Sequence, residues 1–526
     1  MKVWIIGLDG ATFKSIDLLV KKGILPNFKY LFQNGCRAIL KSTMPFFTGP
    51  AWVSMVTGVN PGKHGIFNFT KRIKGESKRR VLSSQDIKCP KIWNILNQYN
   101  KKTGMLNIPM TYPSEEVNGF MITGMMSPEI NDKVSYPKNL IYEIDRYVNG
   151  YIIDIPVILE KHQSDLSIID KLNECLFKRY KAVEFLLDNY DLDFFMVVFV
   201  ILDRLHHLFW KILIHEQFVD NSFYKKVKEK LIESYSHVDE IVGKIIQRMD
   251  DKTVLFITSD HGFGDLKKGF YLNNWLISKN ILRLKTRNTF KSIILSLLSE
   301  RQISFIKKFI PRKLIADYKE KLLEDIIDYS KTIAYSAHSL EQGMYVNDKE
   351  NKQQVLKYLI QALERLTDPE TNEKIVKEIF TKESLYRGPF VDEAPDILIN
   401  TADNGYELSD AIIKGEFLVS KESTTFGIHN RDGIFIAYGD IIKKGVEMPE
   451  TNIVDIAPTV LYAINIPIPT YMDGKILKNI FTENFLQQYP ERYKKTDLFV
   501  DKVSNEVFTE DESEEIKERL KGLGYF

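Results

Sequence analysis

Three apolar runs of the sequence each end at an aspartate, where carboxylates could bind metal ions. The runs lead to Asp9, Asp203 and Asp260. In open α/β sheets ligands bind beyond the carboxyl ends of strands, so carboxylates at three such ends can converge on one site. A single aspartate after a strand is most often a helix cap or a turn residue. Three together favour a shared site, because clustered carboxylates repel one another and bound divalent cations relieve that repulsion.

Histidines accompany two of these aspartates at spacings that suit metal ligation. Asp203 and His207 are four residues apart, which places both side chains on one face of a helical turn. His206 is an alternative to His207, although only His207 has the four-residue spacing. His261 directly follows Asp260 and can ligate from a bend just past a strand. Mixed oxygen and imidazole ligands suit zinc or manganese better than calcium.

Thr48 has the sequence context of a nucleophile. It follows a proline-containing loop and begins a segment with helical character. A hydroxyl at a helix N-terminus lies at the positive end of the helix dipole, which favours an alkoxide and an incoming phosphate. An ordinary threonine cap has the same pattern, so this segment alone leaves both interpretations open.

Strands that alternate with helices must position these residues. Continuous apolar runs are typical of strands in a sheet covered on both faces. The predicted strands are 3–8, 194–202 and 254–258. Apolar residues at three- and four-residue intervals predict helices at 15–22, 172–189 and 223–248. The alternation predicts an α/β fold with a largely parallel sheet flanked by helices.

The motifs of the chain, in their order, resemble the nucleotide pyrophosphatase/phosphodiesterase branch of the alkaline phosphatase superfamily. The nucleophile segment of that branch has Thr-x-Pro, then Thr-Gly, then Pro-x-x-His-Gly-Ile, and all three occur between Thr48 and Ile66. Across residues 1–480 the other matches are Asp9, Asp203-x-x-x-His207, Ser259-Asp260-His261-Gly262 and Gly427-Ile-His429. The resemblance implies an alkaline phosphatase-like three-layer α/β/α sandwich with a helical cap insertion.

The resemblance also implies two divalent metal ions, zinc or alternatively manganese. One ion would bind Asp203, His207 and His429. The other would bind Asp9, Asp260 and His261 together with the Thr48 hydroxyl.

The same resemblance implies roles around the phosphate. Thr48 would attack phosphorus and form a phosphothreonine, which water then hydrolyses. The amide of Gly49 would contact a nonbridging oxygen, and so would Asn68, although its spacing is one residue shorter than in the eukaryotic members. His64 is interpreted as a structural residue of this loop. The sequence lacks the Cys-x-Pro-x-Arg segment of sulfatases.

Three functions follow as hypotheses. The leading one is hydrolysis of a phosphodiester or phosphoanhydride in a small phosphorylated substrate. A phosphomutase or phosphotransferase would use the same metal site, with an organic acceptor in place of water. A catalytically silent binding protein would keep the fold, but such a role requires no particular set of ligands.

The positions of the metal ligands and changes in residue composition along the chain suggest that it divides into a catalytic core, a cap and a tail. Residues 1–265 and 331–482 would form a discontinuous catalytic core, and 483–526 a charged helical tail. Residues 266–330, where Lys and Arg alternate with aliphatic residues, would form a helical cap or lid. Within it, residues 290–314 could instead contact a membrane surface.

The composition excludes some classes of partner. Lys and Arg total 72 against 70 Asp and Glu, so no nucleic-acid polymer is predicted as a ligand. The three cysteines lie far apart, which favours a reducing, cytoplasmic setting. No apolar run approaches the length of about 20 residues that spans a membrane, so no transmembrane segment is predicted. Nothing in the sequence indicates an oligomeric state.

Overall fold

A ten-stranded, largely parallel sheet forms the centre of the computed structural model, which describes residues 1–72, 79–285, 326–421, 424–496, 498 and 507–522. From edge to edge its strands are β20 (Val446–Glu447), β2 (Cys36–Lys41), β19 (Asp432–Tyr438), β9 (Thr253–Thr258), β1 (Lys2–Leu8), β8 (Phe194–Phe199), β5 (Thr103–Ile108), β6 (Gly119–Thr123) and β7 (Ser135–Tyr136), and β21 (Thr451–Asn452) pairs with β2. The central strand β1 is parallel to both neighbours, whereas β19 is antiparallel to both of its own. The carboxyl ends of β9, β1 and β8 therefore meet at one edge of the sheet.

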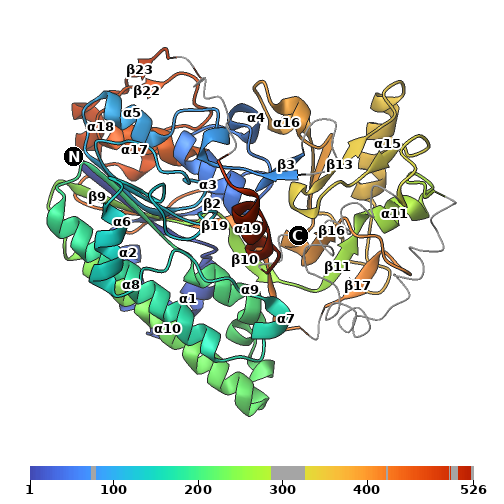
Figure 1. The fold of residues 1–526 in the computed structure, drawn as a ribbon, viewed down its shortest axis with the longest axis horizontal. Helices are drawn as coiled ribbons and strands as arrows, with labels where there is room; N and C mark the ends of the chain where they lie inside the picture. The colour runs from blue at the N-terminus through green and yellow to red at the C-terminus, as the bar shows by residue number, and fades with distance from the viewer. Residues whose placement is uncertain (73–78, 286–325, 422–423, 497, 499–506, 523–526) are drawn as a thin grey trace.

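Helices cover both faces of this sheet. Side chains of β1 alternate between two hydrophobic cores, with Trp4 and Ile6 in one and Val3 and Ile5 in the other. The first face carries α1 (Phe13–Lys21), α2 (Pro26–Asn34), α8 (Ser167–Asn189), α9 (Ile201–Ile214) and α10 (Ser222–Ile246), and the second carries α3 (Thr48–Thr57), α5 (Ile92–Gln98) and α17 (Ile456–Ala463) (Figure 1). This arrangement confirms the predicted three-layer α/β/α sandwich.

The predicted strand at 194–202 extends three residues too far. Strand β8 ends at Phe199, Val200 has near-helical backbone angles, and α9 begins at Ile201. The sequence could not mark this boundary, because a buried strand and a buried helical turn are both apolar runs. Asp203 consequently lies in the first turn of α9 rather than at a strand end.

Described residues between 268 and 421 form a separate group, which we call the second lobe (Figure 1). It has its own core around Trp275, Leu359 and Ile397. Its elements are β11 (Lys268–Tyr271), α11 (Leu272–Ser278), β12 (Ala334–Tyr335), β13 (Gly343–Val346), α15 (Lys352–Glu364), β14 (Glu378–Thr381), α16 (Lys382–Leu385), β15 (Ile397–Asn400), β16 (Tyr406–Ser409) and β17 (Leu418–Ser420).

The expected boundary between cap and core, at residues 330 and 331, falls inside the second lobe. The described part of the expected cap contains β11 and α11, and residues 286–325, including the stretch proposed for membrane contact, lie outside the described residues. No helix in the described part of the chain combines the length and apolar character needed to cross a membrane.

A strand pair leads from the sheet to the second lobe, and a C-terminal helix packs against the first core. An antiparallel pair of short strands, β10 (Gly262–Asp265) and β18 (Gly427–Asn430), runs from the sheet edge toward the second lobe, which lies between them in sequence. Near the C-terminus, α19 (Glu510–Gly522) packs Ile516 and Leu520 into the first core. Among the described residues, the remaining α-helices and strands are β3 (Thr70–Arg72), β4 (Arg79–Val81), α4 (Pro61–His64), α6 (Leu140–Val148), α7 (Leu159–His162), β22 (Ile468–Pro469), α18 (Glu483–Gln488) and β23 (Tyr493–Lys494).

Candidate metal centre and nucleophile

The fold brings the three predicted carboxylates together at the carboxyl edge of the sheet. Asp9 directly follows β1, Asp260 lies two residues beyond β9, and Asp203 lies in the first turn of α9 after β8. Each is at most 1% exposed. Since β9, β1 and β8 are adjacent parallel strands, their ends deliver these side chains to one place.

His261 lies between two of the carboxylates. Its Nε2 is 3.3 Å from Asp260 Oδ2 and 3.7 Å from Asp9 Oδ1. The other oxygens are held by protein donors, because Trp52 Nε1 donates to Asp9 Oδ2 at 3.1 Å and Gly10 N to Asp260 Oδ1 at 3.2 Å. The three inward atoms, Asp9 Oδ1, Asp260 Oδ2 and His261 Nε2, are buried without a hydrogen-bond partner. They are close enough together to hold one metal ion.

The tautomer of His261 suits this role. Its Nδ1 lies 3.2 Å from the Gly262 carbonyl oxygen and can donate only to it, which leaves Nε2 with a lone pair. In many proteins, a hydrogen bond from the ring nitrogen that does not bind the metal orients the ligating imidazole.

Asp203 belongs to a second group of candidate ligands, beside the first group of Asp9, Asp260 and His261. Its Oδ1 is 3.2 Å from His429 Nε2 and 3.4 Å from His207 Nε2, and these two nitrogens are 2.8 Å apart. Its Oδ2 accepts a hydrogen bond from Arg204 Nη1. His261 Nε2 lies 3.9 Å from Asp203 Oδ1, so Asp203, His261 and His429 also form a group that could hold a metal ion. The two groups thus adjoin at His261.

Gly10 allows the first and second groups to adjoin. Its φ is +67°, and a Cβ there would lie 3.0 Å from Asp203 Cα, so a side chain at this position would press against α9. Its carbonyl oxygen accepts a hydrogen bond from His206 Nδ1 at 3.1 Å, while His206 Nε2 bonds the Tyr235 hydroxyl. Both nitrogens of His206 are therefore engaged, and His207 faces the site instead.

Phe263 supports the histidines and was not identified from the sequence. Its buried ring lies 4.9 Å from that of His429 and 5.0 Å from that of His207. Phe263 of β10 lies opposite His429 of β18 in the strand pair. The His429 ring stacks on the His261 ring, with 3.7 Å between ring centroids. The signal available in the sequence was only that Phe263 follows His261 by two residues.

Without a bound cation, the buried carboxylates of the site differ in how readily they ionise. Burial, with the neighbouring Asp260 and Asp203 carboxylates, raises the pKa of Asp9 well above its usual value. Burial and Asp203 do the same to the pKa of Asp260. Burial opposes ionisation of Asp203 too, but His207 and Arg204 outweigh it and hold the pKa well below the usual value. Burial lowers the pKa of His261 to about 4. Bound divalent cations would favour the ionised carboxylates.

Thr48 is the first residue of α3 and is 1% exposed. One turn further along the same helix, Trp52 holds Asp9, so the N-terminal part of α3 is tied directly to the carboxylate group. Gly7 makes room for this contact, because a Cβ there would lie 2.4 Å from the Trp52 ring. Sequence reasoning did not identify Trp52, although it lies four residues after Thr48.

Asn68 offers a buried donor, and Gly49 lies in the first turn of α3. Asn68 Oδ1 accepts from Phe69 N at 2.7 Å and from Thr70 N at 3.4 Å, which orients its amide. Asn68 Nδ2 is buried without a hydrogen-bond partner. The amide of Gly49, the second residue of α3, belongs to the group of helix N-terminal amides without a partner inside the helix.

His64 is structural, as the sequence analysis expected. Its Nδ1 accepts from Ile66 N at 3.1 Å, and its Nε2 bonds Ser54 Oγ at 2.9 Å, which joins this loop to α3. Complete burial lowers the pKa of His64 to about 3, so the imidazole is neutral.

Comparisons with known proteins place this geometry in context. A model of the type I phosphodiesterase / nucleotide pyrophosphatase family matches residues 3–432. Phosphonoacetate hydrolase from Sinorhizobium meliloti 1021, solved with phosphonoformate, has a TM-score of 0.52 and 13% identity, covering 88% of this chain and 95% of its own. Murine ectonucleotide pyrophosphatase / phosphodiesterase 5 has a TM-score of 0.48 and 14% identity, covering 93% and 100%. A search of curated proteins found no significant match. The likeness to phosphonoacetate hydrolase supports the fold alone.

Added Zn²⁺ or Mn²⁺ should raise the Tm of metal-free protein more at pH 8 than at pH 6. The raised pKa values of Asp9 and Asp260 mean that the folded metal-free protein retains their protons above the unfolded-state pKa of about 4. Its stability therefore falls as the pH rises through the folded-state values, whereas bound cations stabilise the ionised carboxylates. Differential scanning fluorimetry with and without a chelator measures the shift. An equal or smaller shift at pH 8 would contradict this electrostatic account.

Proposed function

Because the chain belongs to the type I phosphodiesterase/nucleotide pyrophosphatase family, we propose that it is a metal-dependent phosphoester hydrolase with Thr48 as its nucleophile. This membership confirms the resemblance predicted from the order of the motifs. The proposed substrates are small molecules with a phosphodiester or phosphoanhydride bond.

The convergence of Asp9 Oδ1, Asp260 Oδ2 and His261 Nε2 is the observation that carries the proposal. These buried atoms have no hydrogen-bond partner, and an unsatisfied buried polar group costs free energy. One divalent cation would satisfy all three, and the oxygen and nitrogen ligands suit zinc, with manganese as the alternative. The proposed ligands of a second cation are Asp203, His207 and His429.

The proposed chemistry passes through Thr48. When bound, the two cations would lower the pKa of the Thr48 hydroxyl and neutralise charge on the phosphoryl group and the leaving oxygen. Thr48 Oγ1 gives up its proton to solvent and forms a bond to phosphorus as the bond to the leaving oxygen breaks. The leaving oxygen takes up a proton from solvent, and a phosphothreonine results. Water then attacks phosphorus, and Thr48 Oγ1 departs and regains its proton.

Neutral donors would hold the phosphoryl group during these steps. The N-terminal end of α3 carries the positive end of its helix dipole, and the Gly49 amide belongs to it. Asn68 Nδ2 has no other partner and is proposed to donate to a nonbridging oxygen. Thr48 is also proposed to contact the cation held by Asp9, Asp260 and His261.

The expected setting remains cytoplasmic. Support comes from the three cysteines, which are all buried free thiols. Burial raises the pKa of Cys36 to about 11 and that of Cys89 to about 12, so neither is a reactive thiolate.

Thr48→Ala should lower kcat for nitrophenyl phosphodiesters by at least about 10³-fold, because no other hydroxyl replaces the nucleophile. Bound metal, measured by elemental analysis, should persist, since Asp9, Asp260 and His261 remain. Thr57→Ala is the matched control on the same helix, where Thr57 Oγ1 only donates to Val53 O at 2.6 Å. It should lose about 1 kcal/mol of stability and keep its rate. Equal rates in Thr48→Ala and the wild type would exclude Thr48 as nucleophile.

Turnover in ¹⁸O-labelled water should place one labelled oxygen in each phosphoryl product. This result separates hydrolysis from the alternative phosphomutase or phosphotransferase, in which an organic hydroxyl takes the phosphoryl group. Mass spectrometry of the product, after a single turnover with excess enzyme, measures the incorporation. Unlabelled product that appears only when an alcohol acceptor is present would favour the transferase, and absence of any turnover across substrates and metals would favour a binding protein.

A further inference from the structure

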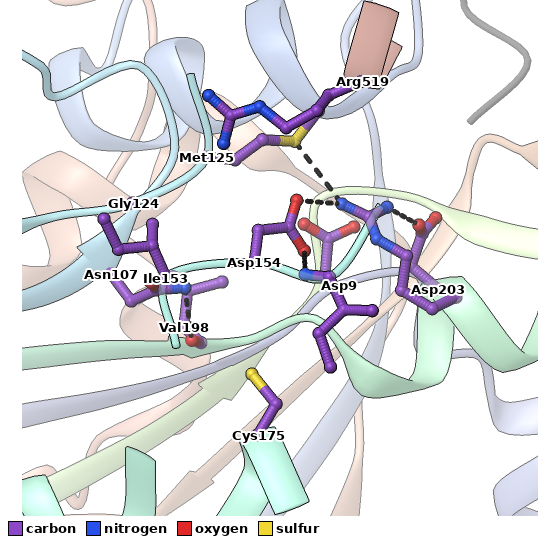
Figure 2. A network of polar contacts seen from close by, with 12 residues as sticks. Asp9, Asn107, Gly124, Met125, Ile153, Asp154, Cys175, Val198, Asp203 and Arg519 are labelled. Carbon is purple, nitrogen blue, oxygen red and sulfur yellow. Dashed lines mark hydrogen bonds and ion pairs between the residues drawn. The ribbon is translucent and has the colours of Figure 1, made fainter. Parts of the chain in front are cut away.

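Arg204 is a buried cation in contact with a proposed metal ligand. It is 1% exposed. Its Nη1 donates to Asp203 Oδ2, and its Nη2 donates to Asp154 Oδ2 at 2.8 Å; Figure 2 labels these two carboxylate partners. Its Nη2 also lies 3.7 Å from Met125 Sδ. The guanidinium therefore bridges two carboxylates that are themselves almost fully buried, with side chains 0% and 8% exposed.

The bridge decides which oxygen of Asp203 faces the histidines. A carboxylate has two equivalent oxygens, and rotation would exchange them. Because Arg204 holds Oδ2, Oδ1 is the oxygen that lies 3.2 Å from His429 Nε2. Each carboxylate receives one guanidinium nitrogen, so Arg204 fixes the direction of one oxygen of Asp203 and ties it to Asp154.

Asp154 holds Arg204 from the other side and is itself firmly placed. It belongs to the segment 149–158 between α6 and α7, which has no regular structure of its own. Arg179 of α8 supports this segment, because its Nη2 donates to Ile152 O at 3.2 Å and to Ile153 O at 2.6 Å. Its Nη1 donates to Val198 O of β8 at 3.3 Å. Arg179 thus ties the segment that carries Asp154 to β8.

We propose that Arg204 and Asp154 are positioning residues that orient Asp203 as a one-oxygen ligand of the second cation. This inference rests on the proposed function, because it needs a metal ion at Asp203, His207 and His429. Because Arg204 contacts both carboxylates, its positive charge is shared between Asp203 and Asp154.

The charge-retaining variant Arg204→Lys separates orientation from simple electrostatics. If Arg204 acted only through its charge, Arg204→Lys, which keeps that charge, would bind the cation as tightly as the wild type. If Arg204 positions Asp203, its removal frees the carboxylate to rotate and the cation binds more weakly. Loss of outer ligand partners of this kind typically weakens metal binding by about 10- to 100-fold.

The experiment titrates metal-free protein with Zn²⁺ in the presence of a competing chelator. We expect Arg204→Met to weaken binding at one of the two sites by about 10- to 100-fold. Arg204→Lys should fall between it and the wild type, because an ammonium keeps the charge but loses the fork. Asp154→Asn should weaken binding in the same direction by a smaller factor. The visible spectrum of bound Co²⁺ should change in Arg204→Met, since it reports ligand geometry.

Lys268→Met is the matched control. Lys268 Nζ lies 2.8 Å from Asp368 Oδ2 in the second lobe, and these side chains are 7% and 0% exposed. Breaking this equally buried ion pair should lower Tm but leave the zinc affinities and the Co²⁺ spectrum as in the wild type.

Several results would overturn the inference. One is unchanged or tighter zinc binding by Arg204→Met, and another is equal weakening by Lys268→Met. If Arg204→Met does not fold, Arg204→Lys and Asp154→Asn give the test with the same expected sign, and wild-type affinity in both would overturn it. Wild-type protein that binds no zinc, manganese or cobalt would instead contradict the proposed function.

Discussion

Three carboxylates buried at one edge of a sheet are the constraint on which the rest of this site depends. Asp9, Asp203 and Asp260 cannot all ionise at low cost without countercharge, since each is at most 1% exposed. The fold assigns one oxygen of each to a protein donor, respectively the Trp52 indole, the Arg204 guanidinium and the Gly10 amide. The remaining oxygens face imidazole nitrogens, as ligands of cations would. These donors lie in α3, in α9 and in the loop after β1, so the site also holds these three elements together.

Long-range pairing completes the ligand sets. His429 reaches Asp203 across 226 positions of sequence because β18 pairs with β10, which directly follows His261. Phe263 of β10 then fills the space against the rings of His207 and His429. Apolar contacts of Met44 and Phe46 with Tyr386 and Leu398 attach the second lobe beside the loop that leads to Thr48.

Much of the fold and of the candidate site could be predicted from local patterns. Continuous apolar runs marked β1 and β9 to within one residue, and ordered motifs named the residues that the fold gathers. The patterns failed where the deciding contact is remote. The turn from β8 into α9 depends on burial on all sides, which an apolar run shares with a strand. Arg204, Trp52 and Phe263 carry no motif, because their importance arises only from which side chains the completed fold places beside them. The second lobe was not delimited, since its short strands pair across long separations in sequence.

The central claim is that two divalent cations bind between these carboxylates and histidines. Anomalous diffraction from crystals soaked in Zn²⁺, with data collected on both sides of the zinc absorption edge, tests it most directly. We expect two peaks, one bounded by Asp9 Oδ1, Asp260 Oδ2 and His261 Nε2, and one bounded by Asp203 Oδ1 with His207 and His429 Nε2. No peak at this edge of the sheet, or peaks that none of these atoms contacts, would contradict it.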